Sequence, residues 1–285
     1  MKFSGYGLDR PAALAHKIGL RMHARPAHLS WPGGIASFTF DDFPKSAFAV
    51  GGRILEGYGA RGTYYTSMDL AGTHQRVGRI FDHEDICAAH HAGHEIACHT
   101  FPHLDCYDAP KRSILAAIRD NAVALSSVIE GFVPTNFAYP RGRVSPMAKR
   151  LLGPRFSSCR GVRGGINSGI IDLADLLAVA IFDSDFDEAE MRRLINENRA
   201  LGGWLIFYTH DVGDAPLPFG CKRGQLDAVV AYASKRTTIL PVRDVVARLR
   251  PLKVIARTAY NMIPGRVHRE WNILQWLIAG GKQFV

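Results

Sequence analysis

Two adjacent carboxylates, Asp41 and Asp42, follow directly after the strand-forming run at residues 35–40. Aspartate is uncommon in strands and neighbouring carboxylates repel each other, so the pair needs either solvent or a cation beside its charges. A solvated loop that caps the next helix would account for an isolated pair of this kind. The chemistry of the two carboxylates therefore depends on which side chains the fold brings next to them.

Two histidines supply the donors that a metal site would need in addition to a carboxylate. His99 and His103 are four residues apart, and Pro102 suits the first turn of a helix. We therefore expect both imidazoles on one side of that turn. Two imidazoles and one carboxylate are a common donor set for a hydrolytic zinc ion, and Asp42 would complete the set.

A third histidine, His210, follows the strongly apolar run at residues 204–209. Imidazole titrates near neutral pH, so a histidine at a strand end could protonate a leaving amine as a general acid. The structural alternative is a strand-end histidine that is bonded to a backbone carbonyl.

Short strand-forming runs alternate with helical or irregular segments along the chain. Strands are expected at 35–40, 62–66, 94–98, 135–138, 156–159, 176–182 and 204–209, and helices at 82–91, 109–129, 146–152, 188–201 and 223–234. This alternation predicts an α/β fold with a parallel sheet, and the length favours a closed or nearly closed barrel. The chain divides into an irregular lead-in at 1–34, the barrel at 35–250 and a basic amphipathic appendage at 251–285.

The chain of 285 residues has a formal net charge of +9, and its basic residues are unevenly placed. No acidic residue lies between Glu130 and Asp172, whereas seven basic residues fall there, namely Arg141, Arg143, Lys149, Arg150, Arg155, Arg160 and Arg163. Aromatic residues are sparse in this interval and no nucleic-acid-binding motif is present, so we expect no nucleic-acid partner. A local anion-binding face is the preferred interpretation.

The remaining features concern the compartment and the tail. No secretory leader or membrane span is apparent, so we expect a cytoplasmic protein, and five cysteines without a C-x-x-C pair predict reduced, mostly buried thiols. The tail carries Trp271 and Trp276 among apolar residues at helical spacing. A helix packed on the barrel or on a second subunit is favoured there over a helix on a membrane surface.

Four motifs together give the chain a family resemblance. Thr39-Phe40-Asp41-Asp42, His99-Thr100-x-x-His103, Phe137-Ala138-Tyr139-Pro140-Arg141-Gly142 and Phe207-Tyr208-Thr209-His210 resemble the NodB-homology polysaccharide deacetylases, carbohydrate esterase family four, over residues 35–250. The resemblance implies a distorted (β/α)7–8 barrel and metal-dependent removal of acetyl groups from sugars. It also implies that Asp41 is the general base and that Asp42, His99 and His103 bind the metal, most simply Zn²⁺.

The resemblance assigns further roles with two departures from the family pattern. The backbone N–H of Arg141 is expected to stabilise the oxyanion, with Tyr139 and Pro140 next to the substrate. The family's base-orienting arginine aligns with Ala138, so Arg160 is predicted to replace it. The family's Asp-x-x-Asp-Trp motif has no clean match, and the partner of His210 stays open among Asp183, Asp185 and Asp211.

The resulting prediction is a deacetylase for an N-acetylated sugar of a bacterial polysaccharide, oligosaccharide or glycolipid. The basic composition suggests an anionic or lipid-linked substrate, with peripheral contact of the tail at the inner membrane face, and a homo-oligomer is left open. Two alternatives remain at this stage. One is a catalytically impaired barrel that binds sugars or acts as a scaffold, and the other is a hydrolase of a non-sugar amide on the same metal site.

Overall fold

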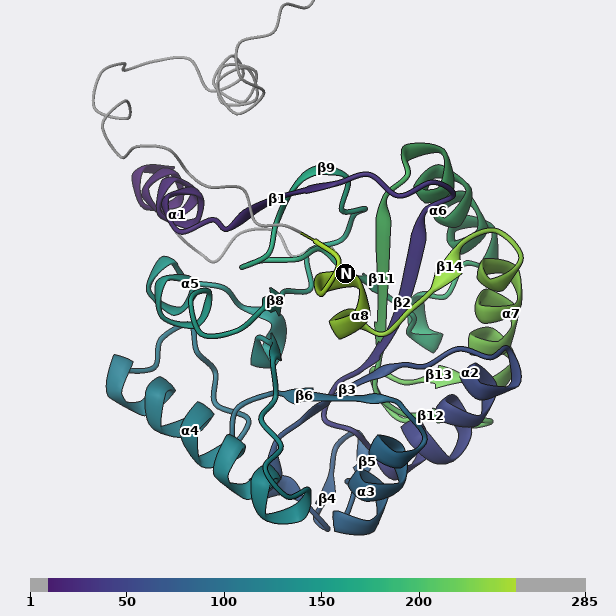
Figure 1. The fold of residues 1–285 in the computed structure, drawn as a ribbon, viewed down its shortest axis with the longest axis horizontal. Helices are drawn as coiled ribbons and strands as arrows, with labels where there is room; N and C mark the ends of the chain where they lie inside the picture. The colour runs from purple at the N-terminus through teal and green to yellow at the C-terminus, as the bar shows by residue number, and fades with distance from the viewer. Residues whose placement is uncertain (1–9, 250–285) are drawn as a thin grey trace, which may run out of the picture.

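The computed structural model describes residues 10–249 of the chain. Parallel strands form one curled sheet at its centre, and helices surround this sheet (Figure 1). The strands follow one another around the sheet as β2 (Ile35–Phe40), β3 (Thr63–Thr66), β6 (Glu95–Cys98), β7 (Asn136–Ala138), β8 (Ser158–Arg160), β10 (Val179–Ala180) and β11 (Trp204–Thr209). β11 pairs with β2 along its whole length, so the last of these strands lies next to the first. The predicted α/β fold with a distorted barrel is confirmed.

The barrel is irregular between β8 and β10. Within residues 10–249 no ladder joins these two strands, and the chain before β10 contacts β8 through an isolated bridge between Arg160 and Leu176. The Leu176 N–H donates to the Cys159 carbonyl at 2.9 Å, and the Gly161 N–H donates to the Leu176 carbonyl at 3.0 Å. Because these bonds stand in place of a full ladder, the barrel closes only loosely on this side.

Helices cover the outer face of the sheet. They are α2 (Arg53–Gly57), which continues the π-helical segment η1 (Ala47–Gly52), α3 (His83–His91), α4 (Lys111–Val128), α5 (Pro146–Leu152), α6 (Glu188–Leu201) and α7 (Arg223–Ser234). The short helix α8 (Val242–Val246) lies instead over one end of the barrel, near the middle of the view in Figure 1. Short 3₁₀ turns follow three of the strands, at η2 (Met68–Leu70), η3 (Pro140–Gly142) and η4 (Asp183–Asp185). α5, α6 and α7 begin and end at the residues that the sequence predicted.

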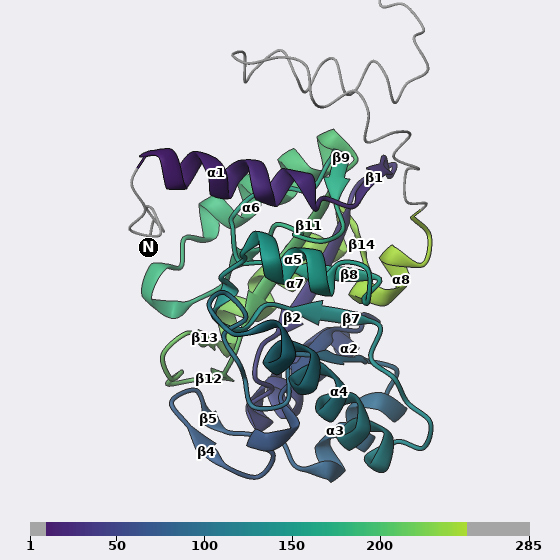
Figure 2. The same ribbon diagram turned by 90° about the vertical axis from the view of Figure 1, so that its left-hand side faces the viewer.

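The segment before the barrel is more regular than the sequence suggested. It holds the helix α1 (Arg10–Met22) and the strand β1 (Pro26–Leu29), which pairs antiparallel with β9 (Gly169–Asp172). Figure 2 shows α1 lying across one end of the molecule, above α5. The sequence indicates a short helix around residues 12–20 within an otherwise irregular lead-in at 1–34, and α1 covers this range. It does not predict β1, because the partner of this strand lies more than 100 residues later in the chain.

Two short pairs of strands extend beyond the carboxyl ends of the barrel strands. β4 (His74–Gln75) and β5 (Gly78–Arg79) form a hairpin after β3, while β12 (Val212–Gly213) and β13 (Cys221–Lys222) pair after β11. β14 (Thr238–Ile239) pairs with the first two residues of β2. The hairpin and the β12–β13 loop both lie at the end of the barrel where catalytic residues are expected.

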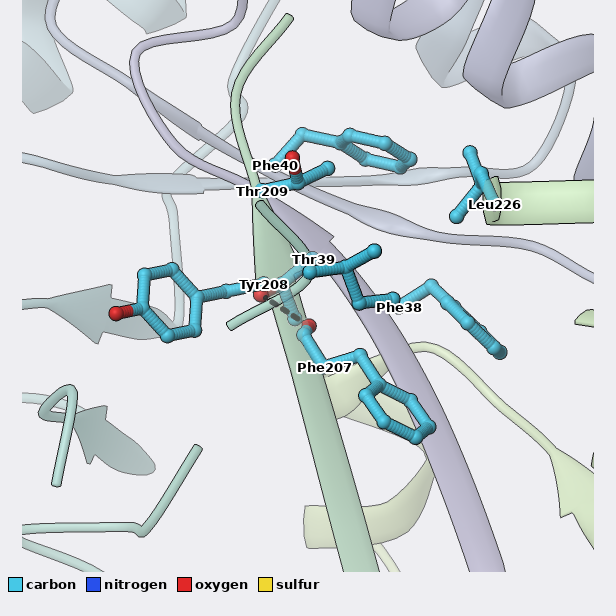
Figure 3. A pocket seen from close by; sticks show the side chains of 8 residues that line it. Phe38, Thr39, Phe40, Phe207, Tyr208, Thr209 and Leu226 are labelled. Carbon is cyan, nitrogen blue, oxygen red and sulfur yellow. Dashed lines mark hydrogen bonds between the residues drawn. The ribbon is translucent and has the colours of Figure 1, made fainter. Parts of the chain in front are cut away.

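The alternation of side chains along β2 and β11 separates two environments. Figure 3 shows Phe38 and Phe207 on the same side as Leu226 of α7, with Tyr208 on the opposite side. The rings of Phe38 and Phe207 are stacked with their centroids 5.2 Å apart. The narrow gap drawn in Figure 3 lies in this apolar layer, has no room for a water molecule and offers no catalytic side chain.

A buried carboxylate occupies the amino-terminal end of the barrel. Glu95, at the first position of β6, accepts hydrogen bonds from the Thr63 hydroxyl (2.8 Å), the Asn136 amide (2.6 Å) and the backbone N–H of Arg243 (2.8 Å). The Val242 N–H donates to the Thr63 hydroxyl at 3.0 Å. This network ties α8 to three strands, so Glu95 is a structural residue at the end of the barrel opposite His99.

Two further features are the state of the cysteines and the length of the helices. All five cysteines are unpaired and four of them are buried. No helix within residues 10–249 is both long and apolar enough to cross a membrane. The predictions for the tail at 251–285 lie outside the described residues.

Candidate active site

Asp41 and Asp42 leave the end of β2 in different directions. The Asp41 N–H donates to the Thr209 carbonyl at 2.9 Å, which extends the pairing of β2 with β11 by one residue. Asp41 is buried, with 4% of its surface exposed. Asp42 adopts a left-handed backbone with φ of 59°, so the chain turns out of the strand at this residue. The two carboxylates therefore belong to different sets of contacts.

His99 continues β6 and is fixed in orientation by its own strand neighbours. Its backbone N–H donates to the Thr66 carbonyl at 3.0 Å, and its Nδ1 lies 2.9 Å from the carbonyl oxygen of Ala138. A carbonyl can only accept, so Nδ1 carries the proton and Nε2 keeps its lone pair. A histidine held in this way presents Nε2 as a metal ligand.

His103 reaches the site on a turn instead of a helix. Phe101 and Pro102 form the turn, and Thr100 and His103 have positive φ angles of 62° and 53°. The Leu104 N–H donates to the Thr100 hydroxyl at 2.7 Å and holds the turn closed. The expectation that Pro102 begins a helix is therefore wrong, although the two imidazole rings still lie with their centroids 5.0 Å apart.

The three predicted metal ligands converge. One ligand atom each of Asp42, His99 and His103 lies within 4.8 Å of the other two. Asp42 Oδ1 is 3.3 Å from His103 Nε2 and 3.7 Å from His99 Nε2. This carboxylate oxygen is buried and has no hydrogen-bond partner among the described residues. A buried oxygen without a donor is costly, and a cation between it and the two imidazoles would satisfy it.

The protonation states of these side chains suit metal binding. Burial lowers the pKa of His99 to about 3 and also lowers the pKa of His103, so both imidazoles are neutral at pH 7. Burial raises the pKa of Asp42 to about 6, so its carboxylate still carries a charge at neutral pH. Neutral imidazoles and an ionised carboxylate are the forms that coordinate a divalent cation. The residues present therefore fit such an ion.

Asp41 is held by a buried arginine. The Arg160 guanidinium, which is fully buried, donates from Nη2 to Asp41 Oδ1. Its carbon Cζ lies 4.9 Å from the ring centroid of Tyr65 and 5.2 Å from that of Tyr208. Burial by itself would raise the pKa of Asp41, but the charge of Arg160 and its hydrogen bond lower it below its ordinary value. Asp41 is thus ionised and able to accept a proton.

His210 faces the same cluster from β11. Its Nε2 lies 3.9 Å from Asp42 Oδ2, and its Nδ1 lies 3.2 Å from the Phe219 carbonyl. Asp211 accepts instead from the Ser46 hydroxyl and the Leu217 N–H. The backbone carbonyl of Phe219 thus occupies the position next to Nδ1 for which the sequence offered three aspartates. Of these, Asp183 also bonds elsewhere, to Lys222 and Gln225.

Two side chains of the third motif, Tyr139 and Pro140, are buried. Tyr139 is buried, and its hydroxyl donates to the Ala174 carbonyl at 3.0 Å. Pro140 is buried as well. The expected contact of these two residues with substrate stays a prediction, and the side chain of Tyr139 packs in a buried apolar cluster. Arg141 is exposed, with φ of 59°, and its charge contributes to lowering the pKa of His103.

Four of the seven residues in the basic stretch after the third motif form ion pairs. Their partners are Asp105 and Asp108 for Arg143, Asp172 for Lys149, Asp41 for Arg160 and Asp175 for Arg163. The aspartates lie outside the acid-free interval in sequence. The stretch therefore presents less free charge than its sequence suggests, and the anion-binding face stays a prediction.

Backbone strain is concentrated around the site. Among residues 10–249 the non-glycine residues with positive φ are Asp42, Phe43, Thr100, His103, Arg141 and Phe219. Left-handed backbone costs about 1–3 kcal/mol at a non-glycine residue and is common at functional sites. The sequence analysis missed Phe219 because it belongs to no motif. It also missed Tyr65 and Tyr208, whose inward positions on their strands could have been inferred from side-chain alternation.

Comparison with known proteins relates part of the chain to one family. Residues 30–153 match the family model described as polysaccharide deacetylase. This part of the chain is therefore similar to polysaccharide deacetylases. A comparison with curated proteins found no match. Polysaccharide deacetylases are hydrolases that act on amide bonds, and they generally use a divalent metal.

Solved structures support the fold of this chain. It is similar to a putative polysaccharide deacetylase from Mycobacterium smegmatis, with 21% identity, a TM-score of 0.56, and coverage of 85% of this chain and 98% of the other. It is also similar to PdaA of Bacillus subtilis, a family 4 carbohydrate esterase, with 14% identity, a TM-score of 0.53, and coverage of 81% and 88%. At these identities the likeness concerns the fold alone.

Proposed function

We propose that this protein removes the acetyl group from an N-acetylated sugar of a bacterial polysaccharide, oligosaccharide or glycolipid. We further propose that it uses a divalent cation, preferably zinc, bound by Asp42, His99 and His103. The observation that carries the proposal is the buried, unpartnered Oδ1 of Asp42 between two neutral imidazoles, next to the ionised Asp41. Hydrolysis of an amide needs an electrophile, a base and an acid, and the site offers residues for each role.

The base and its support come from two strands. A divalent cation held by the three ligands would polarise the acetyl carbonyl and make a bound water more acidic. Asp41 accepts a proton from the attacking water, because it stays ionised and buried beside the site. Arg160 keeps this carboxylate in one orientation through its Nη2 donor and keeps it charged.

The acid and the oxyanion donor lie on the other loops. His210 protonates the sugar nitrogen as the amide bond breaks, with Nε2 facing the cluster and Nδ1 held at the Phe219 carbonyl. The backbone N–H of Arg141 is assigned to the oxyanion because of its place in the third motif.

Acetate release tests the proposal directly. The purified protein is incubated with N-acetylated oligosaccharides and glycolipids, O-acetylated sugars and simple N-acetyl amides, before and after removal of metal by a chelator. We expect acetate from an N-acetyl sugar, loss of activity on chelation, and recovery when Zn²⁺ is added. Asp41→Asn serves as the inactive comparison. Binding of Zn²⁺ and sugar without acetate release would instead indicate a sugar-binding barrel, and release from simple amides only would indicate a non-sugar substrate.

A further inference from the structure

Phe219 is an exposed aromatic residue in direct contact with the proposed general acid. Nearly half of its surface is exposed, at 45%, although its ring centroid lies 5.8 Å from that of His210 and 5.7 Å from that of Phe182. Its backbone has φ of 67°, a conformation that non-glycine residues seldom adopt. The strained backbone of Phe219 thus keeps an apolar ring at the surface beside His210. The hydrophobic effect alone would favour burying this ring.

The ring belongs to a wall made by two loops. Arg76, at the tip of the β4–β5 hairpin, places its guanidinium carbon 5.2 Å from the centroid of Phe219. The same two loops approach closely at a second point, since a Cβ on Gly78 would lie 3.3 Å from Leu217 Cδ1. Arg76 and Phe219 are therefore neighbours because the hairpin after β3 packs against the loop after β11.

The guanidinium of Arg76 is exposed beside the ring of Phe219. Arg76 is exposed, and no carboxylate within residues 10–249 forms an ion pair with it. Of the nearby acids, Asp211 already accepts from Ser46 and Leu217, and Asp183 pairs with Lys222. An arginine stacked on an aromatic ring keeps its planar donor edge free for a carboxylate or phosphate.

We propose that Phe219 and Arg76 form a subsite for a pyranose that carries an anionic group, next to the sugar that is deacetylated. The ring of Phe219 would pack against the apolar C–H face of the pyranose, and the guanidinium of Arg76 would bind its carboxylate or phosphate with two hydrogen bonds. The proposal rests on the proposed function for the identity of the reaction. In this proposal, the β4–β5 hairpin selects substrates by their charge.

Kinetics with matched substrates test this assignment. The substrates are three trisaccharides that contain N-acetylglucosamine and differ in one sugar only. That sugar is neutral in the first, a uronic acid in the second and a phosphate ester in the third. We expect wild type to prefer one or both anionic substrates, and Arg76→Ala to lower kcat/KM for these by about tenfold or more while changing the neutral one less than about twofold. Arg79→Ala, an exposed arginine on the same hairpin, is the matched control and should change neither.

The aromatic half of the subsite has its own variants. Phe219→Ala should raise KM for all three substrates, while Phe219→Trp should retain the wild-type KM because it keeps an aromatic face. Phe219→Trp keeps both the backbone carbonyl and an aromatic ring beside His210, so it should retain the wild-type kcat as well. An equal fall of kcat in both variants, with KM unchanged, would overturn the stacking role.

Direct binding separates this proposal from the proposed function. The three deacetylated trisaccharides, which cannot react further, are titrated into wild type, Arg76→Ala and Arg79→Ala by calorimetry. Tighter binding of the anionic products by wild type and Arg79→Ala but not by Arg76→Ala supports the subsite even if no acetate is ever released. Equal affinity of wild type for neutral and anionic products, or the same loss in both arginine variants, would overturn it.

Discussion

Ala138 and Arg160 are register partners on the adjacent strands β7 and β8. The family resemblance places the base-orienting arginine at the position of Ala138, whereas the structure brings the guanidinium of Arg160 to Asp41 from the next strand. The small side chain of Ala138 shares the barrel interior with Tyr65 and Ala97. An arginine on the neighbouring strand can therefore reach the same carboxylate, because the short side chain of Ala138 leaves room beside it.

Removing the charge of Arg160 should affect stability and catalysis together. Arg160→Met leaves Asp41 buried without its partner, so we expect a loss of about 3–5 kcal/mol in the free energy of unfolding, along with a large fall in kcat. Denaturant unfolding and acetate release measure the two effects. The double variant Arg160→Met with Asp41→Asn should regain much of the stability but none of the activity. A double variant as unstable as the sum of the two single ones would show that the residues are not coupled.

Metal affinity should depend on pH through Asp42. Its pKa is raised by burial to about 6, so protons compete with the cation for this carboxylate below that pH. His99, whose pKa burial lowers to about 3, does not compete until far more acidic conditions. We expect Zn²⁺ affinity, measured with a competing chelator, to be almost constant above about pH 7. Below about pH 6 it should fall by about tenfold per unit. A constant affinity down to pH 5 would contradict the role of Asp42.

The role of His210 can be separated from metal binding. His210→Gln should lower kcat on N-acetyl sugars by about 10²- to 10⁴-fold, because the leaving amine is no longer protonated. An acetyl ester with a good leaving group needs no such proton, so its hydrolysis should fall far less. Zn²⁺ affinity should stay close to that of wild type, since His210 is not one of the three clustered ligands. Equal losses on both substrates would exclude the acid role.

Glu95 should matter for folding and not for chemistry. Glu95→Ala removes the acceptor for Thr63, Asn136 and the Arg243 N–H, and leaves these donors buried. We expect the free energy of unfolding to fall by about 1–3 kcal/mol for each donor that finds no new partner. Zn²⁺ affinity and kcat of the folded fraction should remain within about twofold of wild type. A selective loss of kcat with unchanged unfolding would instead place Glu95 in the catalytic machinery.

Local signals in the sequence determined much of the outer layer of the fold. α5 begins where Ser145 accepts a hydrogen bond from the Ala148 N–H and Pro146 follows as the first helical residue. α6 begins at Asp187, which accepts from two backbone N–H groups, and ends at Gly202 with φ of 57°. Each of these boundaries depends on residues that are close together in the chain, so they could be predicted without the fold.

The sequence alone also determined which residue types stand at the strand ends, because Asp41, Asp42, His99 and His210 each follow a recognisable strand. Only the tertiary structure decided how they are partnered. Arg160 lies 119 residues from Asp41, and the aspartates that neutralise the basic stretch lie outside it. The carbonyl beside His210 comes from Phe219, which carries no motif. The physical reason is that charges and hydrogen-bond donors in a barrel are satisfied across strands, by neighbours that only strand pairing and loop packing bring together.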